Sequence, residues 1–340
     1  MDNIIKKIGS SITFSNNIYI TTTSSIVGPM EKNGPLKEYF DLTLDDMYYG
    51  EDSWEKAESK FVRENFKLCV KKSRLGLNEI DYMITGDLLN QSIGSTFGIR
   101  EFAIPFFGIY GACSTMGEAM SLGSILIDGN FATNILAGAS SHFCSAERQF
   151  RYPLELGTQR PPTSSWTVTG DGAVMLSKKG DKNMPYIKRI TTGKIVDLGV
   201  KDPFNMGGAM APAAADTILQ HFKDFNITPD YYDLIVTGDL GYYGRDIVID
   251  LLEQKGYDMT KNYTDCGILI YDKDKQNTNA GGSGCACSAI TFTGFLYDKL
   301  KAGEIKKLLF IPTGALLSSV STQQGESIPS IAHALSIEIE

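Results

Sequence analysis

The sequence of 340 residues predicts an α/β fold made of two similar halves, each rich in βαβ units. One observation is a repeated phrase, DYMITGDL at residues 81–88, which returns as DLIVTGDL at residues 233–240. Another is the echo of GACS at residues 111–114 in CACS at residues 285–288, each followed by a helical pattern, a glycine and an apolar strand. A period of about 150 to 175 residues is too long for a solenoid. It therefore indicates two α/β halves related by a pseudo-twofold axis.

The repeat divides the chain into an N-terminal half, residues 1–178, and a C-terminal half, residues 179–340. In open α/β sheets, ligands bind beyond the carboxyl ends of the strands. We therefore expect the two strand-to-helix elbows to face one central site. Cys113 and the region of Cys285 should then be neighbours.

The first elements of the chain follow from hydrophobic patterning. Residues 18–22 are typical of an edge strand, and residues 28–46 of a loop rich in glycine, proline and charge. Ser53 is a suitable N-cap for an amphipathic helix that Gly76 would end. Residues 81–88 then predict a short buried strand running into a glycine turn.

The stretch around Cys113 predicts an elbow between a strand and a helix. An apolar strand at residues 104–109 enters a turn of small residues, and helical spacing of apolar residues starts directly after Cys113. A thiol at the positive end of a helix has a lowered pKa, and free N–H groups of the first turn can hold an anion beside it. The alternative is that Cys113 is a small buried apolar residue, as free cysteines often are.

The remaining pattern completes both halves. Strands are expected at residues 134–137 and 307–312, and a helix at residues 213–225. In the last strand His333 shares one face with three aliphatic residues, so we expect it to be packed there; His221, within the helix, is expected at the surface or at its boundary.

Composition excludes several classes of protein. The net charge is −8, with scattered lysine and arginine, so neither nucleic acid nor an anionic lipid surface is an expected partner. Six cysteines in a chain of this length are no disulfide framework, and no Cys/His cluster predicts a metal. No signal peptide and no membrane span is visible. We expect a cytosol-facing protein in a reducing compartment, without metal or cofactor.

Several residues are candidates for a binding site at the elbows. His142 follows a strand through a turn that places it at the same end of the sheet as Cys113, although a packed role is equally open. The turn 281–284 and the turn 207–209 are glycine-rich and suit anion-binding nests, or are simple tight turns. The long connection 138–166 suggests a binding or interface task.

The chain resembles the thiolase superfamily, which includes the ketoacyl synthases. The resemblance rests on the Cys113 elbow, on GDGA within residues 169–176 and on the glycine-rich strand 312–316. More narrowly, the chain is similar to the stage V sporulation protein AD (SpoVAD) family. The runs that carry this narrower resemblance are residues 111–115, 141–143, 147–153, 166–170, 210–217 and 280–285.

The resemblance implies a thiolase-like fold with layers in the order α-β-α-β-α. It also implies a protein that binds dipicolinate (pyridine-2,6-dicarboxylate) and serves, with other SpoVA membrane channel proteins, the uptake of calcium dipicolinate at the spore inner membrane. Any calcium would be held by the dipicolinate itself, because no calcium-loop pattern is present. A homodimer formed through the strand after the elbow helix is a further expectation.

Because dipicolinate is a dianion with an aromatic ring, further residues are candidates for its binding site. Arg148 and Arg151 offer charge-assisted contacts to carboxylates, unless they are merely solvated. Trp166 and Tyr152 can stack on a pyridine ring, or anchor their own loop. The complete set of ligand-binding residues is Cys113, His142, Cys285, Gly282, Gly284, Trp166, Arg148 and Arg151.

Catalysis by a condensing enzyme requires a thiolate, donors that stabilise the enolate and the oxyanion, and a base. The superfamily places a histidine and an asparagine in its second half, where this chain has residues 237–240 (TGDL) and 280–284 (AGGSG). We therefore expect a non-catalytic binding protein with no catalytic residue. The alternative is an acyltransferase of the ketoacyl-synthase III kind, with Cys113 as nucleophile and His142 or Cys285 as donor. A scaffold with an empty pocket is the third possibility.

Overall fold

The longest strand, β2 (Ser11–Val27), lies in the middle of a 13-stranded mixed sheet in the computed structural model, which describes residues 7–150 and 160–340. It pairs antiparallel with β8 (Gly170–Ser177) on one side and with β9 (Tyr186–Thr192) on the other. The expectation of a short edge strand at residues 18–22 was therefore wrong. The serines and threonines of this strand resemble a solvent-facing pattern, but most of them are covered by helices.

The sheet has the same strand order on both sides of the β2/β9 pair. Outward from β2 come β8, β6 (Asn134–Ser141), β4 (Tyr82–Gly86) and β5 (Phe106–Gly108). Outward from β9 come β15 (Ser330–Glu338), β13 (Lys307–Ile311), β10 (Leu234–Thr237) and β11 (Tyr263–Asp265). The directions also match, because the two outermost pairs of each run are parallel and the inner pairs antiparallel. This pattern is what two related halves about a pseudo-twofold axis require, whereas the boundary at residues 178 and 179 stays a prediction.

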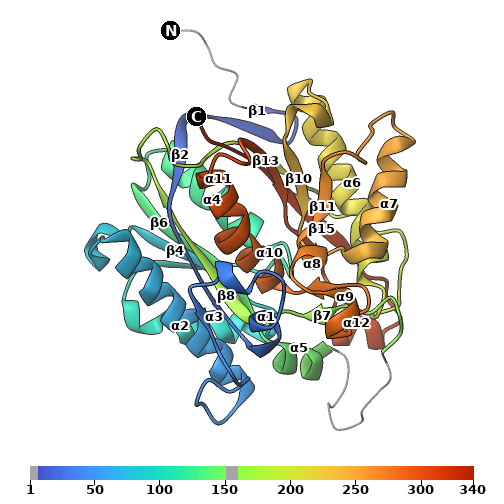
Figure 1. Cartoon of the computed structure of the whole chain (residues 1–340), viewed down its shortest axis with the longest axis horizontal. Coiled ribbons are helices and arrows are strands. Elements are labelled where there is room, and N and C mark those ends of the chain that lie inside the picture. Colours follow the sequence, from blue (N-terminus) through green and yellow to red (C-terminus); the bar gives the residue numbers. More distant parts are fainter. Residues whose placement is uncertain (1–6, 151–159) are drawn as a thin grey trace.

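Helices form the other layers (Figure 1). The elbow helices α4 (Thr115–Asp128) and α10 (Cys285–Thr291) lie in the middle, where α4 contacts strands of both halves, among them β6 and β15. On the outside, α2 (Trp54–Ser73) and α3 (Ile93–Ile99) cover the first half, and α6 (Met206–Phe225) and α7 (Gly241–Glu253) the second. The expected α-β-α-β-α layering of a thiolase-like fold is confirmed.

The ends of the long helices follow local chemistry. Ser53 caps α2 as expected, since its hydroxyl accepts from the Lys56 N–H at 3.4 Å, but the helix stops before Arg74, which adopts a left-handed conformation (φ +62°). Asn205 caps α6, which begins earlier than the apolar pattern suggested. Gly207 therefore lies in the first turn of a helix and not in an anion-binding turn. Its lack of a side chain permits close packing, because a Cβ there would lie 2.4 Å from the Leu240 carbonyl oxygen.

Short elements connect these layers. They are β1 (Lys7–Ile8), α1 (Pro29–Lys32), η1 (Lys37–Tyr39), β3 (Leu42–Thr43), η2 (Leu77–Glu79), η3 (Asn90–Ser92), η4 (Arg100–Phe102), α5 (Phe143–Phe150), β7 (Trp166–Thr167), η6 (Pro229–Tyr231), α8 (Cys266–Leu269), α9 (Lys273–Gln276), β12 (Gly282–Ser283), η7 (Phe292–Leu296), α11 (Tyr297–Lys301), β14 (Thr313–Ala315) and α12 (Ser319–Gln323). α10, η7 and α11 follow one another without a break and form the second elbow helix.

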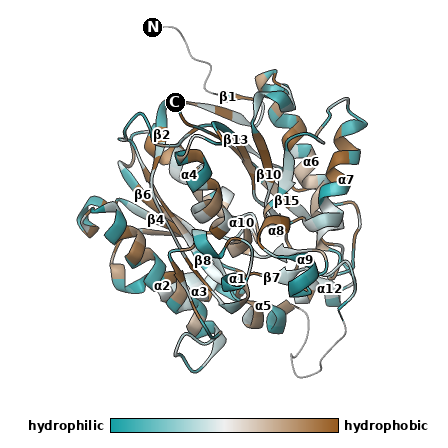
Figure 2. Cartoon of the chain, viewed as in Figure 1, coloured by the Kyte–Doolittle hydropathy of each residue, from teal (hydrophilic) through white to brown (hydrophobic). Residues whose placement is uncertain are grey.

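Hydropathy follows the layering (Figure 2). The strands and the two central helices carry many of the apolar residues, whereas the covering helices mix hydrophilic and apolar residues. In the part of the chain that the structure describes, no helix joins enough length to enough apolar character to cross a bilayer.

Candidate functional site

The Cys113 elbow is a strained turn between β5 and α4. Ala112 has a left-handed backbone (φ +49°), which is unfavourable for a residue with a Cβ. The N–H groups of Ser114 and Thr115 bond to the carbonyl oxygens of Gly111 and Ala112, at 3.0 and 3.1 Å. These two N–H groups at the start of the helix are therefore engaged within the turn, contrary to the expectation that they are free for an anion.

The two elbows meet, as their repeat predicts. The Cys285 thiol donates to the Ala112 carbonyl oxygen, with an Sγ to O distance of 2.9 Å. β14 supports the same turn from behind, because a Cβ at Gly314 would lie 2.1 Å from the Gly111 carbonyl oxygen. Residues from both halves thus fix the conformation of the Cys113 elbow.

The turn that leads into α10 approaches Cys113 from the second half. Gly284 has φ +95°, and its N–H donates to Oδ2 of Asp239 at 2.9 Å. β12 pairs with β7, so that Thr167 lies beside Ser283. This pairing brings the end of the long 138–166 connection to the second elbow.

A cavity lies where these elements converge. Its empty volume is about 460 Å³, including the part open to solvent. The polar groups at its wall come mainly from Cys113, Asp239, Ser283 and Thr167, and most of the remaining wall is apolar. The lining residues are Leu88, Tyr110, Ala112, Cys113, Ala146, Phe150, Thr167, Met206, Met210, Asp239, Ser283, Gly284, Ala315 and Leu317.

The outer side of the cavity adjoins a second hollow. The two share Tyr110, Phe150 and Leu317, and the outer one continues along Gln91 and Ser92 to α12. Gln91 and Ser92 both have left-handed backbones, with φ of 56° and 48°. Such strained residues gather at ligand sites more often than elsewhere.

Asp239 is the acidic group of the cavity. Its side chain is buried, and while Oδ2 accepts from the Gly284 N–H, Oδ1 has no hydrogen-bond partner in the described part of the chain. Burial raises the pKa of Asp239 to about 8, and the neighbouring Asp265 carboxylate adds to the rise. Sequence reasoning treated residue 239 only as a position that lacks a histidine. The repeat of Gly86-Asp87 as Gly238-Asp239 is the signal that would have drawn attention to it.

The Cys113 thiol is a poor nucleophile in this setting. Burial raises its pKa well above the ordinary value, and the nearby Asp239 carboxylate raises it further. The expectation of a lowered pKa was wrong, because loss of hydration and a neighbouring negative charge outweigh the partial positive charge at a helix N-terminus.

His142 lies outside the cavity wall. It is fully buried, its Nε2–H donates to the Met47 carbonyl oxygen at 2.7 Å, and its Nδ1 accepts from the Cys144 N–H at 3.2 Å. Burial lowers the pKa of His142 to about 4, so the ring is neutral at physiological pH. Both ring nitrogens serve the structure, and His142 is not among the groups that can reach a ligand in the cavity.

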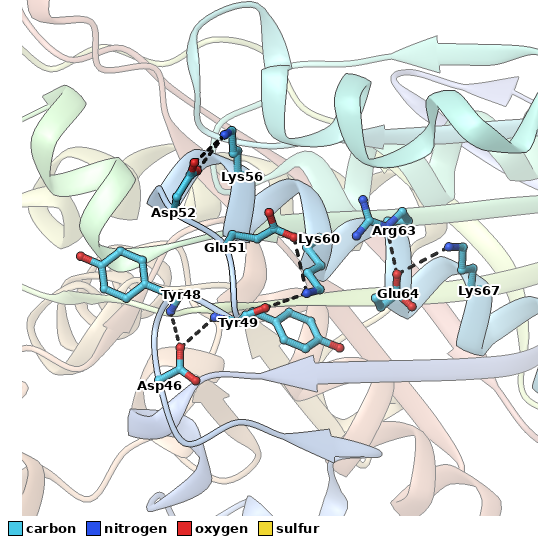
Figure 3. A network of polar contacts seen from close by, with 10 residues as sticks. All are labelled: Asp46, Tyr48, Tyr49, Glu51, Asp52, Lys56, Lys60, Arg63, Glu64 and Lys67. Atoms are coloured by element: carbon cyan, nitrogen blue, oxygen red, sulfur yellow. Dashed lines mark hydrogen bonds and ion pairs between the residues drawn. The ribbon is translucent and has the colours of Figure 1, made fainter.

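The loop that binds His142 is itself well fixed (Figure 3). Asp46 accepts from the N–H groups of Tyr48 and Tyr49, at 2.7 and 2.8 Å, and Lys60 of α2 donates to the Tyr49 carbonyl oxygen at 2.8 Å. Lys60 also pairs with Glu51 at 3.4 Å. The Met47 carbonyl is thus held in place for His142 by a network that starts from α2.

The other sequence-predicted residues divide into three groups. Gly284 lines the cavity, while Cys285 and Gly282 lie behind its wall. Trp166 is stacked on Phe143, with ring centroids 3.8 Å apart, and is a loop anchor outside the wall. The remaining two are Arg148, which pairs with Glu55 on α2 and does not line the cavity, and Arg151, which lies outside the described residues, as does Tyr152.

The chain is similar in sequence to known proteins. The sequence profile of the family described as stage V sporulation protein AD (SpoVAD) matches residues 9–338. The chain belongs to the SpoVAD family. It is 47% identical over 326 residues to stage V sporulation protein AD of Bacillus subtilis (strain 168), covering 96% of this chain and 95% of that protein. The chain is therefore a sporulation protein.

Solved structures related to this SpoVAD-family chain share its fold. The 3-oxoacyl-[acyl-carrier-protein] synthase III of Aquifex aeolicus VF5 is 12% identical, with a TM-score of 0.56, covering 94% of this chain and 99% of that one. Cerulenin-bound OleA of Xanthomonas campestris is also 12% identical, with a TM-score of 0.59 and coverage of 98% and 99%. At this identity the likeness establishes the thiolase-like fold and not the activity.

None of the three histidines in the sequence lines the cavity of this SpoVAD-family member. His221 is fully buried and not at the surface, with Thr191 Oγ1 at 2.7 Å and the Tyr232 hydroxyl at 2.6 Å from its ring nitrogens. His333 is buried on β15, packed as expected. The turn after β10, residues 237–240, contains no histidine and places Asp239 at the cavity.

Proposed function

We propose that this chain binds dipicolinate, free or as its calcium complex, in the cavity between the two elbows, and that it does so without catalysis. The observation that supports this proposal is the cavity itself, which joins apolar walls to a small set of polar groups. A planar pyridine dicarboxylate needs both, because its ring faces are apolar and its carboxylates require hydrogen-bond donors. Any calcium would be held by the dipicolinate.

The absence of catalysis is supported by the state of the cysteine and the lack of an imidazole. A thiol whose pKa is raised is rarely a thiolate at neutral pH, and the thiolate is the nucleophile. Among the described residues that line the cavity, none has an imidazole or amide side chain to stabilise an enolate or a thioester oxyanion. The cavity therefore favours binding over acyl transfer.

The second candidate function is an acyltransferase with Cys113 as nucleophile. It is favoured by the position of Cys113 on a strained elbow at the cavity and by fold relatives that are 3-oxoacyl-[acyl-carrier-protein] synthases III. The two functions differ in one measurable respect. An acyltransferase gains the mass of an acyl group from a thioester, and a binding protein does not.

Calorimetric titration with dipicolinate, with and without calcium, tests the proposal. Benzene-1,3-dicarboxylate serves as a ligand control that lacks only the ring nitrogen. A parallel incubation with acetyl-coenzyme A is read by intact-mass analysis, with Cys113→Ala as the matched variant. Saturable dipicolinate binding with no mass gain supports a ligand-binding protein, whereas an acetyl group that disappears in Cys113→Ala would replace the proposal by the acyltransferase.

We further propose that the chain acts at the spore inner membrane through SpoVA membrane proteins. Support comes from its family membership together with the finding that, over residues 7–150 and 160–340, no helix is suited to crossing a bilayer. Attachment would then depend on contacts with membrane partners.

A homodimer is also proposed, formed at the free edge of β5. The strand after the elbow helix, β6, cannot provide that edge, because it lies between β4 and β8. On β5, Phe107 is 47% exposed at the outer edge of the sheet. The equivalent edge strand of the other half, β11, is largely buried. A second copy pairing along β5 would cover this exposed edge.

A further inference from the structure

The unpartnered oxygen of Asp239 is the starting point. Among the residues that the structure describes, Oδ1 of this buried side chain finds no hydrogen-bond partner, and Asp239 is part of the cavity wall. A buried polar atom without a partner costs free energy, so a native structure that keeps one at a binding cavity points to a partner supplied by the ligand.

The first half of the chain provides an internal comparison. Asp87 follows β4 as Asp239 follows β10, but both its oxygens are used: Oδ1 accepts from the Leu89 N–H at 2.8 Å and Oδ2 from the Ser95 N–H at 2.7 Å. The glycine-aspartate turn is therefore satisfied locally at Asp87 and only half satisfied at Asp239. Within the described residues, Oδ1 of Asp239 has no N–H or O–H donor, and the Cys113 thiol, a weak donor, is a further neighbour of this carboxyl.

The charges around Asp239 determine in which protonation state this residue can bind a carboxylate ligand. No lysine, arginine or histidine is among the residues found to line the cavity in the described part of the chain. Nothing in this wall neutralises a carboxylate, and an ionised Asp239 would repel one. A protonated Asp239, in contrast, offers an O–H donor to the same carboxylate.

The other titratable groups near Asp239 stay neutral, or they titrate outside the pH range in which Asp239 changes its charge. The pKa values of the thiols Cys113, Cys266, Cys285 and Cys287 and of the Tyr110 hydroxyl are all raised, chiefly by burial. Burial raises the pKa of Asp265 to about 6, and this carboxylate accepts from the backbone N–H groups of residues 240, 241 and 267. Asp239, with a pKa of about 8, is the neighbour that titrates just above neutrality.

We propose that Asp239 is a protonated, neutral carboxylic acid when it binds the ligand. Its Oδ1–H then donates a hydrogen bond to a carboxylate oxygen of a small, flat carboxylate. No covalent bond changes in this step, and the proton stays on Asp239 within the hydrogen bond. This inference rests on the proposed function and identifies Asp239 as the residue of the cavity that binds the carboxylate of the ligand. The complex of ligand and Asp239 thus carries one proton that the ionised aspartate lacks.

A pH dependence of binding follows from that proton. Below a pH of about 8, Asp239 already carries the proton, and binding proceeds without exchange. At higher pH, the site must take up one proton for each ligand bound, so the affinity falls by about tenfold per pH unit once the pH is well above the pKa. Dipicolinate is fully ionised throughout, since carboxyl groups titrate near pH ~4.

The test is calorimetric titration with dipicolinate between pH 7 and 9.5, in calcium-free buffer, on the wild type and on Asp239→Asn. The amide keeps an oxygen for the Gly284 N–H and places a permanent N–H donor at the free position. We expect the wild type to lose about tenfold in affinity for each pH unit above the pKa of Asp239, and Asp239→Asn to bind with nearly constant affinity. Asp87→Asn is the matched control and should keep the pH dependence of the wild type.

A measurement on the wild type alone guards against a variant that fails to fold. Titrations at pH 9 in two buffers of different ionisation enthalpy should reveal uptake of about one proton per ligand. Binding without proton uptake, or the same pH profile in Asp239→Asn, would overturn the role of Asp239 while leaving dipicolinate binding intact. Lack of saturable binding by the wild type at every pH would instead overturn the proposed function, and this inference with it.

Discussion

At the scale of single residues, burial decides the chemistry of the site. Cys113 lies on the elbow at the cavity wall, where loss of hydration and the Asp239 carboxylate raise the pKa of its thiol. Glu31, to which we assign no role in the binding site, shows the same effect, since burial raises the pKa of its carboxyl to about 7. Both groups differ from their exposed counterparts because of packing and not because of local sequence.

The raised pKa of Cys113 predicts slow alkylation. At pH 7.5 we expect iodoacetamide to modify Cys113 at least about tenfold more slowly than free cysteine, with a rate that still rises at pH 9, because the thiolate fraction is small. Peptide mass mapping measures the rate, and Cys113→Ser identifies the labelled peptide. Modification faster than that of free cysteine at neutral pH would mean an activated thiol and would revive the acyltransferase.

Glu31 predicts a pH dependence of stability. Its Oε1 accepts from the Thr169 N–H at 3.0 Å and from the Tyr271 hydroxyl, and its Oε2 has no hydrogen-bond partner within residues 7–150 and 160–340. Because the folded pKa lies above the unfolded value of 4.5, the folded state binds more protons, and stability is lost as the pH rises through about 7. The loss attributable to this group is on the order of 3 kcal/mol.

Chemical unfolding of Glu31→Gln between pH 5 and 8 tests whether Glu31 causes this loss of stability with rising pH. The variant should lose less stability over this range than the wild type, whereas Glu38→Gln, at an exposed side chain, should behave as the wild type. An equal decline in Glu31→Gln and the wild type would show that Glu31 is not the source of the pH dependence.

At the scale of elements, the site depends on a contact between β14 and the Cys113 elbow. Gly314 approaches the backbone of Gly111 and Cys113 so closely that a side chain does not fit. The second half of the chain thereby supports the turn that carries the cysteine of the first. His142 illustrates a further contact between elements, since its partner Met47 belongs to the loop that α2 holds in place.

Gly314→Ala should disturb both stability and binding. The added Cβ would lie 2.1 Å from the Gly111 carbonyl oxygen, so the elbow or β14 must shift. We expect a loss of roughly 1 to 3 kcal/mol in the free energy of unfolding, typical of overpacking, and at least about a tenfold loss in dipicolinate affinity, since each 1.4 kcal/mol corresponds to a factor of ten.

Gly303→Ala is the matched control for this prediction. Gly303 also has a positive φ, of +71°, but open space surrounds its Cβ position. We expect a cost of about 1 kcal/mol from the backbone alone, and unchanged dipicolinate affinity. Unchanged affinity in Gly314→Ala as well would show that the elbow tolerates the displacement.

At the scale of the whole molecule, the two runs of strands are alike in order and direction but differ at their edges. β5 carries an exposed Phe107, whereas β11 is largely buried. An exposed apolar edge strand invites pairing with another chain, and proteins normally cover or charge it. The asymmetry therefore assigns the proposed dimer contact to the first half.

Phe107→Lys should dissociate the proposed dimer. Light scattering coupled to size exclusion should give twice the chain mass of 37.2 kDa for the wild type and a single chain for the variant, because the lysine places like charges at a twofold contact. Ile195→Lys, at an even more exposed apolar side chain of the second half, should remain dimeric. A monomeric wild type would remove the proposal.

The architecture of this protein can be predicted from its amino-acid sequence. The echoes of residues 81–88 and 111–114 in the second half predicted related halves, meeting elbows and the neighbouring positions of Cys113 and Cys285, all of which the structure bears out. Such features survive in sequence because turns, caps and buried strands depend on residues close together in the chain. The family followed from long specific runs in the same way.

The chemistry of the cavity, in contrast, depends on tertiary packing. The pKa of Cys113 rises instead of falling, Asp239 and not His142 reaches the cavity, and β2 lies at the centre of the sheet and not at its edge. Each of these depends on which distant segments exclude water from a group and which donors they bring to it. Desolvation and hydrogen-bond partners are properties of packing, and a repeat in the sequence shows where two turns meet but not what surrounds them.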